Sequence, residues 1–161
     1  MATGYSLLRS LTAALMLGVL AGPALARDMT FNIIRVDGST ATVTSNDMQT
    51  IGSVELRTPL VATPGGEHTA KGPLMRDVLA HFKAVGQSVD ITALDGARIE
   101  IPSDDFTRYD VIVATEIDGK IIGVRERGPA WLVYPLKDHP ELVNPVYDMR
   151  SIWQIKEVRM K

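Results

Sequence analysis

The segment 125–135 holds the residues whose types are best suited to chemistry on a ligand. Arg125 and Arg127 stand one residue apart, so on a strand they would face the same side and present two forked guanidinium groups together. Trp131 and Tyr134 offer aromatic faces for stacking. Pro129, which follows a glycine, sets the course of the backbone between the two pairs. This combination predicts a site for a flat, polar, nitrogen-rich ligand; core aromatics with solvated arginines are the structural alternative.

Other kinds of chemistry find little support in the residue types. The chain has no cysteine, so it offers no thiol nucleophile and no thiolate metal ligand, and no serine stands in a Gly-x-Ser-x-Gly motif. The three histidines, His68, His81 and His139, lack metal-site spacing and are expected to be unrelated surface or boundary residues. Asp104 and Asp105 sit beside a short helical turn, in whose first residues acidic side chains are favoured by the helix dipole. No metal site is predicted.

Residues 1–26 have the features of a cleaved export signal. Arg9 supplies a positive charge, an uncharged apolar run follows, and Ala24 and Ala26 form a small-residue cleavage motif. The apolar run is shorter than the ~20 residues of a membrane span, which disfavours a retained anchor. We therefore expect a periplasmic bacterial protein whose residues 27–161 form one domain without disulfides. Its charges are interspersed, with a formal net charge of −2, and no basic stripe indicates nucleic-acid binding.

The elements that must position segment 125–135 follow from apolar periodicity and turn residues. One helix is expected over 73–84, begun by a proline and ended near a glycine, with short helical turns over 45–50 and 103–109. Strands are expected over 29–36, 40–44, 53–62, 89–94, 98–101, 111–117, 120–125, 131–134 and 152–160, several of them joined by Asp-Gly turns. Segments 63–68 and 139–150 are expected to be loops. Strands and helices do not alternate regularly, so we predict an α+β fold, mainly an antiparallel β sandwich or partly closed barrel with one main helix.

Five segments together resemble a known family. They are 71–79, similar to Gly-x-x-Leu-x-Asp-Leu-Leu; 101–105; 113–119; 127–135, similar to Gly-x-Pro-x-Arg-x-x-x-Pro; and 152–155, similar to a closing Lys-Trp segment. In their order and spacing, from about Ser45 to Met160, the chain resembles the molybdopterin-binding domain of sulfite-oxidase-type oxidoreductases, in a short stand-alone exported form. The resemblance implies that fold and a pterin ligand.

Two departures from the family change the function that the resemblance implies. The family holds molybdenum through a cysteine thiolate in a loop after the strand that matches 53–62, and here that strand contains Thr58 with no sulfur ligand near it. The arginine of the family's Pro-x-Arg motif is matched by Trp131, which exchanges affinity for an oxyanion for affinity for a ring. What remains is similar to small periplasmic pterin-binding regulators, whose loaded form docks on the periplasmic domain of an inner-membrane enzyme that makes or degrades cyclic di-GMP.

The resemblance and the residue types assign a role to each candidate. Trp131 and Tyr134 would stack on the pterin, while Arg125 and Arg127 would bind its ring carbonyls or a tail phosphate. Thr58 and the loop 63–68 would cover the place of the absent metal. The full set expected at the ligand is Thr58, Arg76, Arg125, Arg127, Pro129, Trp131, Tyr134, Trp153 and Gln154, with Trp153 as a wall, Gln154 at the pterin edge, and Arg76 equally compatible with an exposed ion pair. A molybdopterin-dependent oxidoreductase with non-cysteine ligation and a purely structural module are the alternatives.

Overall fold

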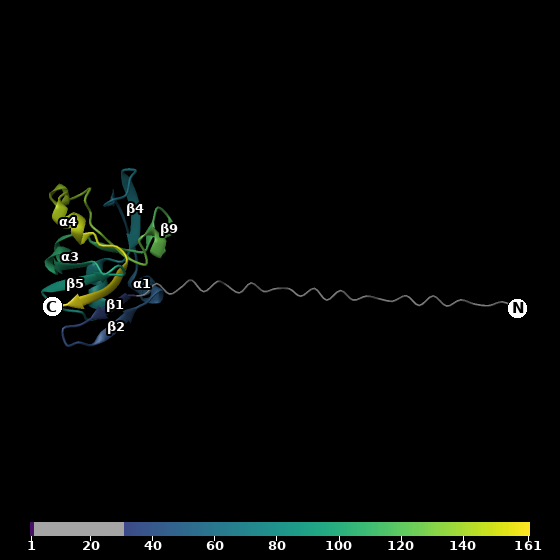
Figure 1. Cartoon of the computed structure of the whole chain (residues 1–161), viewed down its shortest axis with the longest axis horizontal. Helices are drawn as coiled ribbons and strands as arrows, with labels where there is room; N and C mark the ends of the chain where they lie inside the picture. The colour runs from purple at the N-terminus through teal and green to yellow at the C-terminus, as the bar shows by residue number, and fades with distance from the viewer. Residues whose placement is uncertain (2–30) are drawn as a thin grey trace.

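The computed structural model describes residues 31–161 and Met1 (Figure 1). The export signal predicted for residues 1–26 therefore lies outside the described residues, apart from Met1. Within the described part, no helix is long and apolar enough to cross a membrane.

A five-stranded sheet forms the base of the domain. Its order is β2-β1-β11-β5-β6, with bounds β1 Phe31–Ile34, β2 Thr40–Val43, β5 Ser88–Ala93, β6 Arg98–Pro102 and β11 Ile155–Met160. Neighbouring strands are antiparallel except β1 and β11, which are parallel. The N-terminal strand thus lies directly beside the C-terminal one (Figure 1), and this sheet joins the two ends of the described domain.

Two smaller antiparallel sheets complete the β structure. One has the order β3-β4-β8-β9, with β3 Val54–Pro59, β4 Glu67–Gly72, β8 Glu116–Ile117 and β9 Lys120–Ile121; the other pairs β7 Ile112–Ala114 with β10 Trp131–Val133. The five-stranded sheet and the four-stranded sheet each have unpaired edge strands, so the described sheets do not close into a barrel. The predicted α+β class with mainly antiparallel strands is confirmed.

The helices are short and lie between the strands. They are α1 Ser45–Ile51, α2 Met75–His81, α3 Asp104–Arg108 and α4 Pro145–Arg150, with 3-10 turns η1 Val124–Glu126 and η2 Pro140–Leu142. Helix α2 is shorter than the predicted 73–84, because Pro73 O still accepts a hydrogen bond from Val113 N at 2.8 Å and Lys83 leaves the helix with φ +53°. Helix α4 replaces the second half of the predicted loop 139–150. Asn144 caps it through Val146 N and Pro145 occupies its first turn, both usual helix-start features.

The core divides into two clusters that follow the sheets. The larger gathers buried residues of the five-stranded sheet, α2 and α3, among them Ile33, Val78, Ile91 and Phe106. The smaller gathers Leu56, Leu60, Ala70, Ile112, Ala114, Ile122, Trp131 and Val133 between the two smaller sheets. Segment 125–135 therefore contributes to both clusters, with Trp131 in the smaller one and Tyr134 in the larger one.

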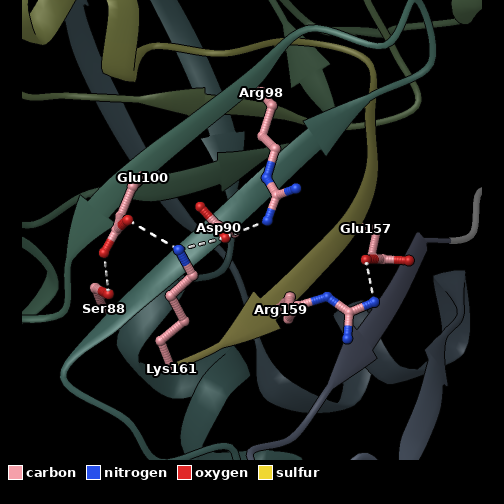
Figure 2. Close-up of polar contacts among 7 residues, drawn as sticks. All are labelled: Ser88, Asp90, Arg98, Glu100, Glu157, Arg159 and Lys161. Carbon is pink, nitrogen blue, oxygen red and sulfur yellow. Dashed lines mark hydrogen bonds and ion pairs between the residues drawn. The ribbon is translucent and has the colours of Figure 1, made fainter.

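Charged side chains fasten the last residue of the chain to the five-stranded sheet (Figure 2). Asp90 on β5 is almost fully buried and accepts from Arg98 and from Lys161, whose Nζ lies 2.7 Å away. Lys161 also pairs with Glu100 at 2.9 Å. Burial alone would raise the pKa of Asp90, but hydrogen bonds from Arg98 and Lys161 hold this pKa below its ordinary value. The ionised carboxylate therefore ties β5, β6 and the end of β11 together.

Candidate functional site

Arg127 is placed by a tight turn. Gly123 O accepts hydrogen bonds from Glu126 N at 3.0 Å and from Gly128 N at 2.7 Å, which closes the turn. A Cβ on Gly128 would lie 2.0 Å from Ile122 O, so only glycine fits there. Arg127 itself has φ +71°, a left-handed backbone conformation that residues other than glycine seldom adopt. Such strain persists where surrounding contacts hold it.

The guanidinium of Arg127 binds the loop 60–66, which joins β3 to β4. Its Nη1 donates to Val61 O at 3.2 Å and to Thr63 Oγ1 at 2.6 Å, while its Nη2 donates to Ala62 O at 2.7 Å. Three acceptors of one short loop are thereby held by a single side chain, which comes from a segment more than sixty residues away.

The same guanidinium lies against two indole rings. Its Cζ atom is 5.0 Å from the ring centroid of Trp131 and 4.9 Å from that of Trp153, and the two rings meet edge to face with centroids 5.8 Å apart. A cation over an aromatic face is attracted by the ring quadrupole. We call these three residues, Arg127, Trp131 and Trp153, the Arg-Trp cluster. The two indoles hold the guanidinium, and the guanidinium binds the loop 60–66.

Trp131 is inside the protein, not on its surface. Its side chain is 3% exposed, and its Nε1 donates to Ser151 O at 3.0 Å. Pro59, Leu60 and Val61 line a gap beside the ring that is too narrow for a water molecule. With the loop in this position, Trp131 offers no free face for stacking.

Tyr134 is an internal anchor. It is 1% exposed, and its hydroxyl donates to Asp105 Oδ2 at 2.9 Å. The same oxygen accepts from Arg150 Nη1 at 2.7 Å. Burial, with the nearby Asp105 carboxylate, raises the pKa of Tyr134, so the phenol stays protonated. The sequence predicted that Asp105 serves the helix dipole and did not reveal its ion pair with Arg150. Arg150 lies on α4, a segment predicted to be loop.

Thr58 is also fully buried, at 0% exposure. Its Oγ1 donates to Tyr134 O at 3.3 Å and accepts from Lys137 N at 3.4 Å. The Thr58 hydroxyl is therefore occupied by backbone partners, and a hydroxyl is a poor metal ligand compared with a soft thiolate. Among residues 31–161, no three histidine, aspartate or glutamate side chains come together as a metal site.

Arg125 does not share a face with Arg127, and the prediction that both lie on one strand is wrong. Strand β9 ends at Ile121, and η1 turns the chain, which leaves Arg125 exposed while Arg127 points to the loop 60–66. The Gly-rich turn overrides the strand pattern because the close approach at Gly128 requires it. Pro129 follows, partly buried, through a cis peptide bond.

Of the remaining candidate residues, Gln154 belongs with the Arg-Trp cluster and Arg76 does not. Gln154 lies beside the Arg-Trp cluster: its backbone N donates to Arg127 O at 3.0 Å and its Nε2 to Val124 O at 2.7 Å. Arg76 forms an ion pair with the exposed Asp110 at 2.7 Å, the alternative weighed for it from the sequence. Arg127, Trp131, Trp153 and Gln154 are thus brought together, whereas Arg125 and Arg76 are not part of this group.

The far end of the loop 60–66 is held by His68, the second residue of β4. Its Nδ1 lies 2.7 Å from Asp118 Oδ2, and its Nε2 lies 3.2 Å from Pro64 O. The hydrogen bond with Asp118 raises the pKa of His68, and the same bond lowers the pKa of Asp118. The loop is therefore held at both ends, by Arg127 near β3 and by His68 near β4.

A wider cleft, of about 240 Å³, lies away from the Arg-Trp cluster. It runs along the start of β3 and has an apolar floor with a charged rim. Its lining residues are Val54, Glu55, Leu56, Leu74, Asp110, Ile112, Pro135, Asp138 and His139. None of the residues predicted to bind a ligand lines it, although Arg76 reaches its rim through Asp110.

Comparison with known proteins identifies the fold but not a family. Neither models of known protein families nor the curated proteins match this chain. Among solved structures, sulfane dehydrogenase SoxCD from Paracoccus pantotrophus matches with a TM-score of 0.59 and 15% sequence identity, over 81% of this chain and 37% of that chain. The likeness supports the resemblance at the level of the fold. The chain spans little more than a third of that protein chain, and a shared fold does not carry an activity with it.

Proposed function

We propose that this domain binds a pterin, or a ring of the same shape and polarity, beneath the loop 60–66, and that it acts as a ligand-loaded sensor. The observation that supports this proposal is the Arg-Trp cluster, in which one guanidinium lies against two indoles and donates to three acceptors of a loop. The groups that a flat heterocycle needs are thus already assembled.

The ligand would take the place of the loop on the guanidinium. The gap beside Trp131 is too narrow for water, so a ring can enter only after residues 59–62 move outward. The movement frees the Arg127 donors from Val61 O and Ala62 O. A pterin ring carries a carbonyl oxygen and ring nitrogens that accept in the same way, and base-like rings gain ~1–3 kcal/mol from stacking on an aromatic side chain. Arg127 is pre-organised for this exchange because the indoles fix it in place.

The chemistry of the donors favours a pterin without its metal. No cysteine is present in the whole chain, and the hydroxyl of Thr58 is committed to Tyr134 O and Lys137 N. The fold shared with the sulfane dehydrogenase supports a relation to oxidoreductase domains. The sequence resemblance supports the finer part of the proposal, a periplasmic regulator that, when loaded, docks on the periplasmic domain of a membrane-bound cyclic di-GMP cyclase or phosphodiesterase.

The first test is the content of the native protein. Protein purified fresh from its source is denatured, and the released small molecules are separated with fluorescence detection, since oxidised pterins fluoresce. Titration calorimetry of the ligand-free protein with biopterin follows, for the wild type and for Arg127→Met, with Arg125→Met as the matched control. We expect Arg127→Met to weaken binding at least tenfold and Arg125→Met to leave it unchanged. Equal affinities for wild type and Arg127→Met would refute the site.

A second candidate function is a molybdopterin-dependent oxidoreductase with non-cysteine ligation, favoured by the shared fold with a dehydrogenase. It predicts stoichiometric molybdenum in the fresh protein, which elemental analysis measures. A pterin released without molybdenum would favour the sensor, and both together would favour the enzyme.

A further inference from the structure

The imidazole of His68 is enclosed by acceptors on both of its nitrogens. Asp118 Oδ2 faces Nδ1 at 2.7 Å, and Pro64 O faces Nε2 at 3.2 Å. A carbonyl and a carboxylate only accept, so both bonds form together only when both ring nitrogens carry a proton. A neutral imidazole has one N–H and leaves one of the two acceptors facing a lone pair.

We infer that His68, as the imidazolium, is a positioning residue that holds the loop 60–66 closed, so that loop opening becomes easier as pH rises. Pro64 belongs to the loop, whereas Asp118 belongs to the turn between β8 and β9, so the imidazolium joins the loop to the body of the domain. For ligand exchange beneath the loop, the inference rests on the proposed function; for loop opening itself, it does not.

The charged groups around His68 are consistent with this role. Asp118 also accepts from Thr69 N at 2.9 Å and is influenced by the charge of Lys120, both of which keep it ionised. The adjacent Glu67 is engaged by Arg57 at 2.9 Å and by Lys137 at 3.0 Å.

On the neighbouring strand β3, the residue paired with His68 is Thr58, which is uncharged. At the other end of the loop, Arg127 is bound to backbone oxygens and to Thr63. Within the described residues, Asp118 is therefore the charged group that directly faces the imidazole.

The direction of the pH effect follows from the pKa of His68, which the hydrogen bond to Asp118 raises above its ordinary value of about 6.5. A group whose folded-state pKa is raised contributes its full stabilisation below the unfolded value and loses it as pH rises through the folded value. The loop is thus held most firmly below the unfolded value and is released as pH rises through the raised folded value.

Amide hydrogen exchange of the ligand-free protein tests the inference directly. The reporter is Thr63, whose N–H donates to Leu60 O at 3.2 Å within the loop. After correction for the intrinsic pH dependence of exchange, we expect its protection factor to fall about fivefold between pH 5.5 and 9, the effect of losing one hydrogen bond. The step should disappear in His68→Gln and persist in His81→Gln, which changes a histidine on α2. A wild-type protection factor without a pH step overturns the inference.

Two further measurements keep the test decisive if His68→Gln folds poorly. Asp118→Asn removes the negative charge and should move the step to lower pH, and nitrogen shifts of the His68 ring should report two protonated nitrogens at pH 5.5. An unshifted step in Asp118→Asn would contradict the inference.

Ligand release then separates this inference from the proposed function. The dissociation rate of biopterin should rise with the same pH midpoint as loop opening. A pH step in hydrogen exchange with no effect of pH on biopterin, or with no biopterin binding, supports the role of His68 and refutes the ligand site beneath the loop.

Discussion

Arg127→Met is the substitution that tests the Arg-Trp cluster most sharply. The methionine side chain keeps an unbranched apolar stem against the indoles of Trp131 and Trp153, but it carries no N–H donor and no charge. The three hydrogen bonds to the loop 60–66 and the two cation–π contacts are therefore lost while much of the packing remains. The left-handed φ of +71° at position 127 costs arginine and methionine about the same, since neither is glycine. Backbone strain therefore does not contribute to the difference in stability between wild type and Arg127→Met.

The expected loss follows from these contacts. A hydrogen bond contributes ~1 kcal/mol net, and a cation–π contact near the surface contributes ~0.5–1 kcal/mol. One guanidinium makes all five contacts and the freed loop carbonyls can rehydrate, so the sum is not additive. We expect the free energy of unfolding to fall by about 2–3 kcal/mol, a mid-range value for the loss of a connected set of polar contacts.

Urea denaturation followed by tryptophan fluorescence measures this loss. The chain has two tryptophans, and both lie in the Arg-Trp cluster, so the signal also reports the cluster directly. Arg125→Met is the control, because Arg125 is exposed on η1 and has no hydrogen bond or ion pair within the described residues; it should stay within ~0.5 kcal/mol of wild type. Arg127→Lys should be intermediate, because one ammonium cannot reproduce the planar fork. A stability of Arg127→Met equal to that of the control would show that the cluster does not hold the loop.

Three other predictions concern the scaffold around the site. Asp105→Asn leaves the partly buried Arg150 beside a neutral group and should lower the free energy of unfolding by about 2 kcal/mol in urea. Gly128→Ala places a Cβ 2.0 Å from Ile122 O, so the turn must shift, and thermal unfolding should show a loss of ~3 kcal/mol or more. The lowered pKa of Asp90 means that its stabilisation is present above its ordinary value of about 3.8 and is lost as pH falls through the lower folded value, so Asp90→Asn should flatten the acid side of the stability curve.

An exposed neighbour of Asp105 supplies the control for Asp105→Asn, and each of the other two predictions has an outcome that would contradict it. Asp104 precedes Asp105 in the first turn of α3 and is exposed, so Asp104→Asn should change the free energy of unfolding little. A melting temperature of Gly128→Ala equal to that of wild type would mean that the turn 123–128 has room for a side chain. An unchanged acid limb in Asp90→Asn would show that other carboxylates dominate acid unfolding.

Local patterns predicted much of the fold. The Asp-Gly pairs at 37–38, 95–96 and 118–119 each join two antiparallel strands, as the turn preference of these residues requires. The boundaries were less predictable where tertiary contacts intervene. Residues 73–74 continue as extended chain because they pair with the segment 111–113, although their sequence is compatible with a helix.

The candidate site shows the same division. Sequence reasoning selected Arg127, Trp131, Trp153 and Gln154, which do lie together, because their residue types and the resemblance pointed to one ligand. It placed Arg125 with them on the assumption of a continuous strand, which η1 interrupts. It did not single out His68 as the second fastening of the loop, because Asp118 lies fifty residues away along the chain and no local pattern joins them.

The sequence by itself determined the absence of a thiolate, the three Asp-Gly turns between strands and the residue types available for a ring, since these depend on composition and on near neighbours. Only the tertiary structure decided that Trp131 and Tyr134 are covered and that Arg127 spends its donors on the loop 60–66. The physical reason is that burial and hydrogen-bond partners are set by segments distant in the chain, which pack against one another only once the sheets have formed.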